Sequence, residues 1–230
     1  MSISSDIRAG IADIALAALA VIPICLLLGA VAAAKGLSPL EVTLMSVFVF
    51  AGGAQFAAIE QWTSPAPIAA LAFGTLLINS RHILMGASLA PKTGLFTPWQ
   101  RLVGFFFMAD ENWAFAERRA SRTSLTPAYW FGMSLMLYGS WVIGSTLGAI
   151  IGPMLGDPAR LGADFAFSAL FIGLVAGFWK GRITAVTIIA SGLCAAAVKV
   201  TIGAPWHVPA GALAGILAAY FAAAPEEAAA

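Results

Sequence analysis

Gly53-Ala54-Gln55-Phe56 and Gly162-Ala163-Asp164-Phe165 are nearly the same tetrapeptide, and each lies in or at the start of a long apolar stretch. The first carries an uncharged amide and the second a carboxylate. A polar side chain at membrane depth costs on the order of a few kcal/mol, so it is usually paired or functional. A glycine-flanked polar site that recurs in both halves of a membrane chain predicts a transporter built from two repeats, with substrate held between them.

The composition is that of an integral membrane protein. Hydrophobic residues make up 60% of the 230 residues and charged residues 10%, against about 25% charged in an ordinary soluble domain. The formal net charge is +1, which gives no basis for nucleic-acid binding. Cys25 and Cys194 lie in apolar runs, so we interpret them as reduced packing residues and predict neither a disulfide nor a metal site.

The apolar segments predict an all-α polytopic membrane protein with about seven transmembrane helices. Several segments are shorter than the roughly 20 residues of a simple span, and short or glycine-interrupted spans are typical of broken helices. The charge-free run of the first segment predicts a retained helix rather than a cleaved signal peptide. The segments cover about 14–34, 42–61, 67–90, 128–152, 163–179, 183–202 and 208–224.

Residues 98–122 differ from these segments because charged and aromatic side chains alternate there. Such a stretch is too charged for a lipid-facing span and suits an amphipathic helix that lies at the interface or dips into the protein. We therefore predict a single transmembrane domain over residues 1–230. Its predicted parts are a first repeat at about 10–91, an amphipathic connector at about 92–126, a second repeat at about 127–203 and an extra helix at about 207–224.

Internal similarity predicts that the two repeats are inverted. Leu28-Gly29-Ala30-Val31 in the first segment resembles Leu147-Gly148-Ala149-Ile150 in the fourth, and the similar tetrapeptides follow in segments two and five. Three spans per repeat is an odd number, so the second repeat would sit upside down relative to the first. This inverted three-plus-three repeat predicts a site near the membrane midplane.

Lys and Arg residues gather around the 91–127 connection. The positive-inside tendency then favours this connection in the cytoplasm, an N-terminus outside and a C-terminus inside. The prediction assumes that every segment crosses the membrane.

Glycines recur at a spacing of four, which forms a flat stripe on a helix and predicts close helix packing. The stripes are Gly144, Gly148 and Gly152, then Gly173, Gly177 and Gly181, then Gly211 and Gly215.

Gln55 follows two glycines, which let a helix unwind and free its backbone groups. Free N–H groups at a helix start attract a carboxylate, and free carbonyls attract an ammonium, so an amino-acid zwitterion would suit the site. The side chain of the substrate would contact Phe56 and Phe165. The alternative is a pair of packing glycines with Gln55 bonded to a neighbour.

Asn79-Ser80-Arg81-His82 lies inside the third segment. Arg81 cannot lose its proton, so it either binds a substrate carboxylate or pairs with Asp164 or Asp110. Histidine side chains can change charge near neutral pH, so His82 is either a proton relay or a hydrogen-bonded packing residue.

Carboxylates in a low-dielectric site can take up and release protons. Asp164 is therefore a candidate for proton coupling, with helix capping as the alternative, and the acidic pair at 110–111 is another, with surface salt bridges as the alternative. The predicted substrate-binding residues are Gly52, Gly53, Gln55, Phe56, Asn79, Arg81, Asp164 and Phe165, and the predicted proton-coupling residues are His82, Asp110, Glu111 and Asp164.

Several chemistries are not indicated, since the sequence has no nucleotide-binding P-loop, zinc-binding His-Glu-x-x-His helix or Gly-x-Ser-x-Gly elbow. We predict no cofactor, no metal and no enzymatic activity. The rival predictions are a permease subunit of an ATP-driven transporter, an intramembrane enzyme that uses Asp110, Glu111 and His82, and a purely structural subunit.

Four runs of residues resemble the signatures of the AzlC family, in order and over most of the chain. They are Phe50-Ala51-Gly52-Gly53-Ala54-Gln55-Phe56, Asn79-Ser80-Arg81-His82-Ile83-Leu84-Met85-Gly86, Ala109-Asp110-Glu111 and Leu161-Gly162-Ala163-Asp164-Phe165-Ala166. Ser80 departs from the pattern, because leucine is more usual there.

This resemblance implies the larger subunit of a branched-chain amino-acid exporter, driven by an ion gradient, in the cytoplasmic (inner) membrane of a bacterium. It also implies a small hydrophobic partner, an AzlD-type membrane subunit. The implied substrates are valine, leucine and isoleucine, with methionine as a further candidate. The resemblance assigns no role to individual residues.

Overall fold

Regular secondary structure in the described residues is helical. The structure, a computed structural model, describes residues 3–154, 172–173, 175–176, 179, 181–203 and 206–227. Its helices are α1 (Ile3–Ala20), α2 (Ile22–Ala34), α3 (Pro39–Phe48), α4 (Gly52–Glu60), α5 (Ile68–Asn79), α6 (Arg81–Leu89), η1 (Ala90–Lys92), α7 (Pro98–Phe106), α8 (Asp110–Ala120), α9 (Pro127–Ile151), η2 (Gly152–Met154), α11 (Arg182–Thr201) and α12 (His207–Glu227).

The chain divides into two compact units. The first unit comprises Met1–Ala66 and Ile78–Phe167, and the second comprises Pro67–Leu77 and Ser168–Ala230. The predicted site residues that the structure describes all belong to the first unit.

In the second unit, α11 and α12 pack together through small residues. A Cβ added to Gly211 would lie 2.9 Å from the Cβ of Ala195, and one added to Gly215 would lie 3.2 Å from the Cβ of Ser191. The predicted packing role is confirmed for this stripe. Gly173 and Gly181 have no such neighbour among the described residues, and Gly177 lies outside them.

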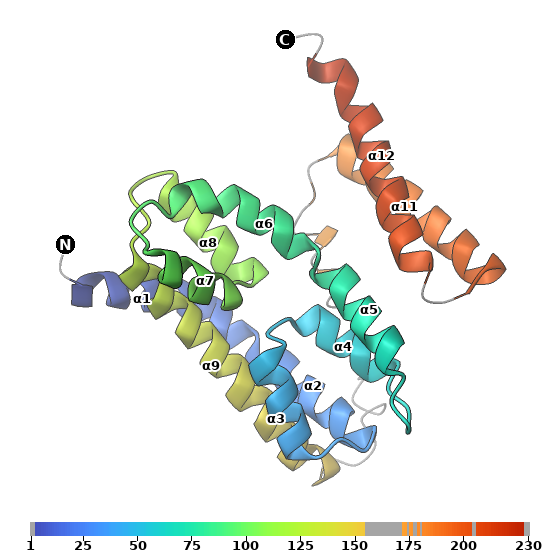
Figure 1. Cartoon of the computed structure of the whole chain (residues 1–230), viewed down its shortest axis with the longest axis horizontal. Coiled ribbons are helices and arrows are strands. Elements are labelled where there is room, and N and C mark those ends of the chain that lie inside the picture. Colours follow the sequence, from blue (N-terminus) through green and yellow to red (C-terminus); the bar gives the residue numbers. More distant parts are fainter. Residues whose placement is uncertain are drawn as a thin grey trace. The chain divides into compact units, whose positions relative to one another are not determined.

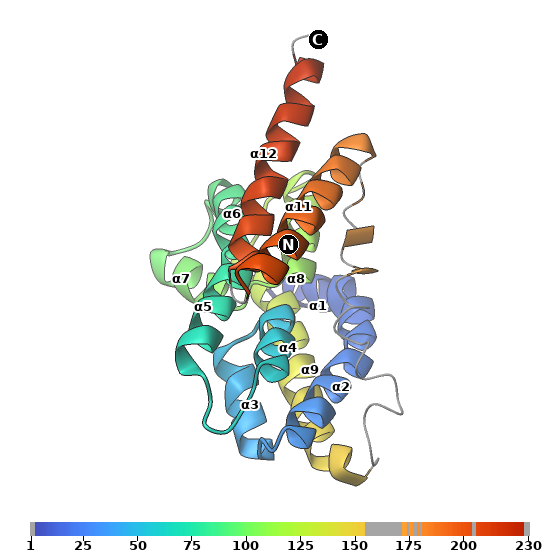
Figure 2. The ribbon, with the colours of Figure 1, turned by 90° about the vertical axis from the view of Figure 1, so that its right-hand side faces the viewer.

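Helix α9 is the axis of the first unit, and α1 and α2 lie along it (Figures 1 and 2). A Cβ on Gly132 would lie 2.7 Å from the carbonyl oxygen of Ile7, and one on Gly152 would lie 2.6 Å from the Cα of Ala30. Because residue numbers rise together along both partners, α1–α2 and α9 run in the same direction. We refer below to the Thr126 end and the Gly152 end of α9.

The glycines of α9 allow this close approach. A Cβ on Gly144 would lie 3.3 Å from the Cβ of Cys25, and one on Gly148 would lie 2.8 Å from the Cα of Leu26. Small residues let two helix backbones approach within a membrane. The packing role predicted for these glycines is therefore confirmed.

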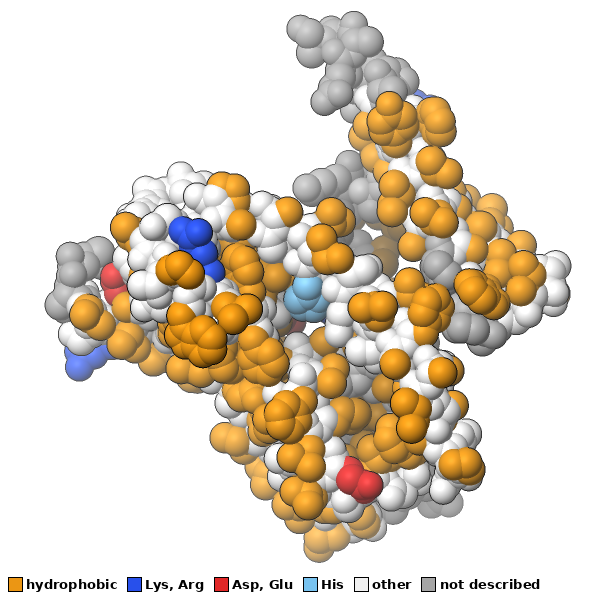
Figure 3. All heavy atoms as spheres, viewed as in Figure 1, with side chains coloured by type: hydrophobic (Ala, Val, Ile, Leu, Met, Phe, Trp, Pro, Cys, Tyr) orange, Lys and Arg blue, Asp and Glu red, His pale blue; other side chains and the backbone are white. Residues whose placement is uncertain are grey.

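The described helices have the lengths and surface of a membrane protein. Three helical runs, Ile68–Lys92, Pro127–Met154 and Arg182–Thr201, are long and apolar enough to span a bilayer, and α1 with α2 makes a fourth candidate bent by 48°. On the face drawn in Figure 3, hydrophobic side chains cover much of the surface and charged ones are sparse. These runs agree with predicted segments one, three, four and six; most of segment five lies outside the described residues.

Helices α3 and α4 form a hairpin that begins and ends near the Gly152 end of α9. Near its beginning, the hydroxyl of Thr43 lies 2.8 Å from that of Thr146 in α9. After a break at residues 49–51, α4 turns back, and the Nζ of Lys35 donates to the carbonyl oxygen of Glu60 at 3.4 Å. The exit of α4 therefore lies beside the end of α2, close to where α3 starts.

Helices α7 and α8 form a second hairpin, at the Thr126 end. In α7, the carbonyl of Gly104 accepts a hydrogen bond from the Nε1 of Trp130 at 3.1 Å. After a break at residues 107–109, α8 returns, and the guanidinium of Arg119 lies 4.6 Å from the ring centroid of Tyr129. The predicted connector is thus a hairpin of two helices packed on α9 rather than one amphipathic helix.

The hairpins alter the predicted topology. Thr126 Oγ1 donates to Asp6 Oδ2 at 2.9 Å, so the start of α1 lies at the Thr126 end, beside the end of the connector. The sequence prediction placed these parts on opposite sides because it counted segment two as a crossing. The return of α4 removes that crossing.

The predicted inverted repeat is not confirmed. It requires the first and fourth segments to run in opposite directions, whereas α1–α2 and α9 run in the same direction. The similarity between Leu28–Val31 and Leu147–Ile150 has another physical reason, because both stretches supply the small residues at which α2 and α9 meet.

Candidate functional site

The tip of the first hairpin, residues 49–51, lies at the glycines singled out in the sequence. Helix α4 begins at Gly52 without a side-chain cap, so its first backbone N–H groups have no intrahelical acceptor and carry partial positive charge. Glycine is required at the first position because a Cβ on Gly52 would lie 2.6 Å from Cη2 of Trp141. Gly53 is buried, which keeps this helix start within the protein.

Gln55 is fixed by a buried hydrogen-bond network. Its Nε2 donates to Ser46 Oγ at 3.0 Å, and its Oε1 accepts from Trp141 Nε1 at 2.7 Å. Ser46 in turn lies 2.8 Å from the hydroxyl of Ser145. Gln55 is thus bonded to neighbours, the alternative left open by the sequence, and its role as a substrate ligand stays a prediction. The neighbouring Phe56 is buried as well.

The tip of the second hairpin, residues 107–109, is held by Asn112. Its Oδ1 accepts from the backbone N–H of Ala109 at 2.7 Å, and its Nδ2 donates to the carbonyl of Phe107 at 2.6 Å and to Ser134 Oγ at 2.9 Å. One buried amide therefore replaces the helical hydrogen bonds lost at the break and ties the tip to α9.

The second tip brings together two sequence motifs that are far apart in the chain. Arg81 Nη1 and Asp110 Oδ2 form an ion pair at 2.9 Å, so the predicted pairing of Arg81 with Asp110 is present, while Asp164, the other predicted partner, lies outside the described residues. His82 has both ring nitrogens close to carbonyl oxygens, with Nδ1 3.1 Å from that of Asn79 and Nε2 3.2 Å from that of Met108.

Two polar atoms at this junction are buried without a hydrogen-bond partner among the described residues, Asn79 Oδ1 and Arg81 Nε. One is an acceptor and the other a donor, and buried groups of this kind usually have a partner. Glu111, next to Asp110, lies in the first turn of α8 directly after the second tip.

A stripe of polar and aromatic side chains on α9 contacts both hairpins. Trp130 bonds to Gly104 and Ser134 to Asn112, both in the second hairpin. Tyr138, Trp141 and Ser145 bond to Val47, Gln55 and Ser46 of the first hairpin, respectively. Their spacing of three or four residues places them on one helix face. The sequence prediction missed this spacing, because each of these residues taken alone is typical of ordinary helix packing.

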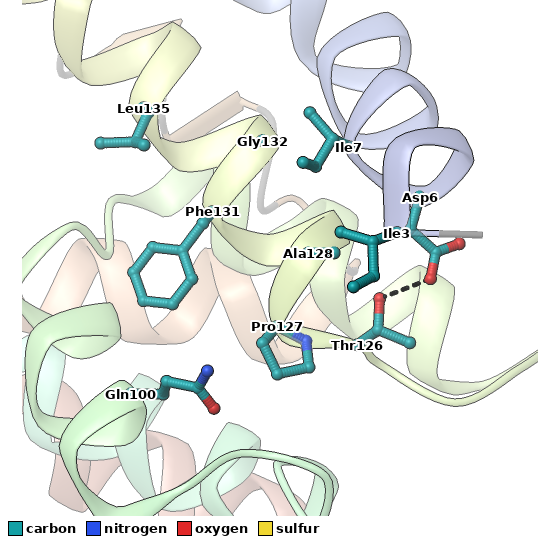
Figure 4. A pocket seen from close by; sticks show the side chains of 10 residues that line it. All are labelled: Ile3, Asp6, Ile7, Gln100, Thr126, Pro127, Ala128, Phe131, Gly132 and Leu135. Atoms are coloured by element: carbon teal, nitrogen blue, oxygen red, sulfur yellow. Dashed lines mark hydrogen bonds between the residues drawn. The ribbon is translucent and has the colours of Figure 1, made fainter. Parts of the chain in front are cut away.

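An open pocket of about 590 Å³ lies at the Thr126 end, between α1, α7 and α9 (Figure 4). Its walls are mainly apolar, with Asp6 and Thr126 hydrogen-bonded to each other at one side. It contains none of the residues that the sequence singled out.

Asp164 and Phe165 lie outside the described residues, so their predicted roles in substrate binding and proton coupling stay predictions. Within the described part of the chain, no group of three His, Cys, Asp or Glu residues could hold a metal ion.

Comparison with known proteins gives a family for the chain. Residues 17–155 match the model of the family described as AzlC protein. No solved structure matches the chain.

Three relatives illustrate the range of similarity. An uncharacterized membrane protein of Archaeoglobus fulgidus is 30% identical over 166 residues, 71% of this chain and 72% of the relative. The inner membrane protein YgaZ of Escherichia coli is 29% identical over 208 residues, 85% and 80% of the two chains. The branched-chain amino acid transport protein AzlC of Bacillus subtilis is 30% identical over 154 residues, 63% and 56% of the two chains.

Proposed function

Because the chain belongs to the AzlC protein family, we propose that it is a membrane transport subunit that exports branched-chain amino acids. It works as a secondary active exporter and not as an enzyme. The name of the Bacillus subtilis relative supports this class of substrate. Valine, leucine and isoleucine are the proposed substrates, with methionine as a further one.

The observation that carries the proposal is the pair of unpartnered buried atoms at the α5–α6 junction. Arg81 Nε is a free donor and Asn79 Oδ1 a free acceptor among the described residues. An amino-acid zwitterion offers the two complementary groups, a carboxylate for Arg81 and an ammonium for Asn79. The uncapped start of α4 at Gly52 and Gly53 offers a second place for the carboxylate.

Apolar contacts would select the substrate side chain. A hydrophobic pocket separates side chains that differ by one methylene by about 1–3 kcal/mol. We therefore expect the transporter to accept several branched-chain amino acids and methionine, with graded preference.

Proton coupling is proposed for His82, Asp110 and Glu111. Neutral imidazole has one N–H and can donate to one of the two carbonyls near His82, whereas the protonated ring can donate to both. Protonation of Asp110 would remove its charge and release Arg81 for the substrate carboxylate. Such an exchange of partners links proton binding to substrate binding. Asp164 stays a proposed coupling residue from its sequence position.

The protein is proposed to be a multi-pass protein of the bacterial cytoplasmic membrane. The name of the Escherichia coli relative, an inner membrane protein, supports this location. A small AzlD-type membrane subunit is its proposed partner.

The test is efflux of labelled valine from proteoliposomes that contain this chain and the small subunit, with leucine and methionine as competitors and an imposed proton gradient. We expect gradient-dependent efflux that Arg81→Lys reduces by about tenfold or more, since the loss of a hydrogen bond to a charged group costs about 1.5–3 kcal/mol. Arg101→Lys is the matched control, because Arg101 donates to the carbonyl of Thr93 at the hairpin start.

Efflux at the parent rate in Arg81→Lys would argue against the proposed carboxylate site. Movement that needs ATP and ignores the gradient would favour the ATP-driven alternative. Absence of movement for all three amino acids, with the protein intact, would remove the proposed substrate class.

A further inference from the structure

The tips of the two hairpins meet at one residue of α9, Tyr138. Its ring centroid lies 5.1 Å from that of Phe50 in the first tip and 4.9 Å from that of Phe107 in the second, both in edge-to-face geometry. Its hydroxyl donates to the carbonyl of Val47, at the end of α3, at 3.0 Å.

Tyr138 also lies close to the middle of α9, which runs from Pro127 to Ile151. At about 1.5 Å per residue, it is about 18 Å from either end of the helix. The hydrocarbon core of a bilayer is about 30 Å thick, so a spanning α9 would put Tyr138 near the midplane. Non-helical backbone is tolerated at that depth where protein surrounds it.

Each hairpin reaches this point from a different end of α9. The first starts and finishes by the Gly152 end, where Lys35 meets Glu60. The second returns to the Thr126 end, where Arg119 lies over Tyr129.

We propose that the α3–α4 and α7–α8 hairpins enter the membrane from opposite faces and that Tyr138, held between their tips, closes the path between the two faces. Opening of this path toward either face then requires one hairpin tip to move away from the Tyr138 ring. Tyr138 is a positioning residue, because it acts through the two tips. The proposal rests on the proposed transport function but not on the identity of the substrate.

The ring also lies between the two groups of candidate residues. The proposed carboxylate-binding helix start at Gly52 follows the first tip, and His82 is bonded to Met108 in the second tip. A shift of the second tip on protonation would therefore disturb the contacts of Tyr138 with the first. This arrangement provides a physical link between proton binding and exposure of the substrate site.

The entry faces are tested with single cysteines in a Cys194→Ser chain, labelled in sealed vesicles by a membrane-impermeant maleimide. Lys35→Cys and Thr63→Cys flank the first hairpin, and Ser121→Cys follows the second. We expect the first two to be labelled from one face and the third from the opposite face. Labelling of positions 35 and 63 from opposite faces would overturn the proposal. The chain without an added cysteine, which retains buried Cys25, is the blank.

The barrier is tested as proton leak into liposomes, with a pH-sensitive dye and no amino acid present. Tyr138→Ala is expected to leak several-fold more than the parent. Tyr138→Phe keeps the ring and loses the hydrogen bond to Val47. It should therefore leak no more protons than the parent but change the rate of gradient-driven transport. Ser140→Ala, on the same helix, removes a bond within α9 and is the control.

A folded Tyr138→Ala protein with the proton leak and the transport rate of the parent would overturn the proposed role of Tyr138 as a barrier. If that variant does not fold, Phe50→Leu and Phe107→Leu decide, because each removes one edge-to-face contact and should raise the leak. These experiments use no amino acid for the leak and labelling arms, so their failure is distinguishable from failure of the proposed substrate.

Discussion

Gln55 is the partner of two buried side chains, Ser46 and Trp141. A buried donor or acceptor left without a partner costs about 1–3 kcal/mol. We therefore expect Gln55→Met, which keeps the length of the side chain, to lower the free energy of unfolding by about that amount for each group left unpaired. The measurement is thermal unfolding of the purified protein in detergent.

Gln61→Met is the matched control for this prediction. The Gln61 amide donates to the carbonyl of Ala57 one turn earlier, and Gln61 itself is exposed. Surface changes of this kind usually stay within about 0.5 kcal/mol. Equal loss of stability in the two variants would argue against the importance of the buried network.

Sequence reasoning found the polar residues but not their partners. Gln55, Arg81 and Asp110 stood out because polar groups are costly in apolar stretches. Tyr138 did not stand out, because an aromatic residue in an apolar helix is ordinary and its role comes from Phe50 and Phe107, which are distant in sequence.

The packing of α2 on α9 gives a prediction at the scale of helices. Gly148→Ala would place its Cβ 2.8 Å from the Cα of Leu26, so the two backbones must separate. Overpacking of this kind costs about 1–3 kcal/mol, and we expect a lower thermal midpoint.

Gly139→Ala in the same helix should have the opposite effect. Its Cβ would meet nothing within 4 Å among the described residues, and alanine favours a helix by up to about 1 kcal/mol over glycine. Similar thermal midpoints for the two variants would show that the contact between α2 and α9 is loose.

The breaks in the helices were predictable, whereas the direction of the chain after each break was not. Glycines at 52–53 predicted an interrupted helix in segment two, and the structure has its break directly before them. Whether α4 continues or returns depends on distant contacts such as that of Lys35 with Glu60. The second hairpin was missed for the same reason, since Asn112 holds it through Ser134 of α9.

At the scale of the whole first unit, its described basic side chains favour one end of α9. Lys35 is at the Gly152 end and Arg81 is at the second tip. The others lie toward the Thr126 end: Arg8, Lys92, Arg101, Arg118, Arg119 and Arg122. Because Lys and Arg near span ends favour the cytoplasm, this asymmetry favours the Thr126 end as the cytoplasmic end, and that end holds Arg8, which the sequence prediction put on the opposite side.

The N-terminus should therefore lie in the cytoplasm. A reporter that fluoresces only in the cytoplasm should be bright when fused before Asp6 or inserted after Ser121, and dark when inserted after Thr63. A reporter active only outside the cytoplasm should give the reverse pattern. An N-terminal fusion and an insertion at 121 that report different compartments would contradict the hydrogen bond between Asp6 and Thr126, because two groups at opposite faces of a bilayer core about 30 Å thick cannot be bonded.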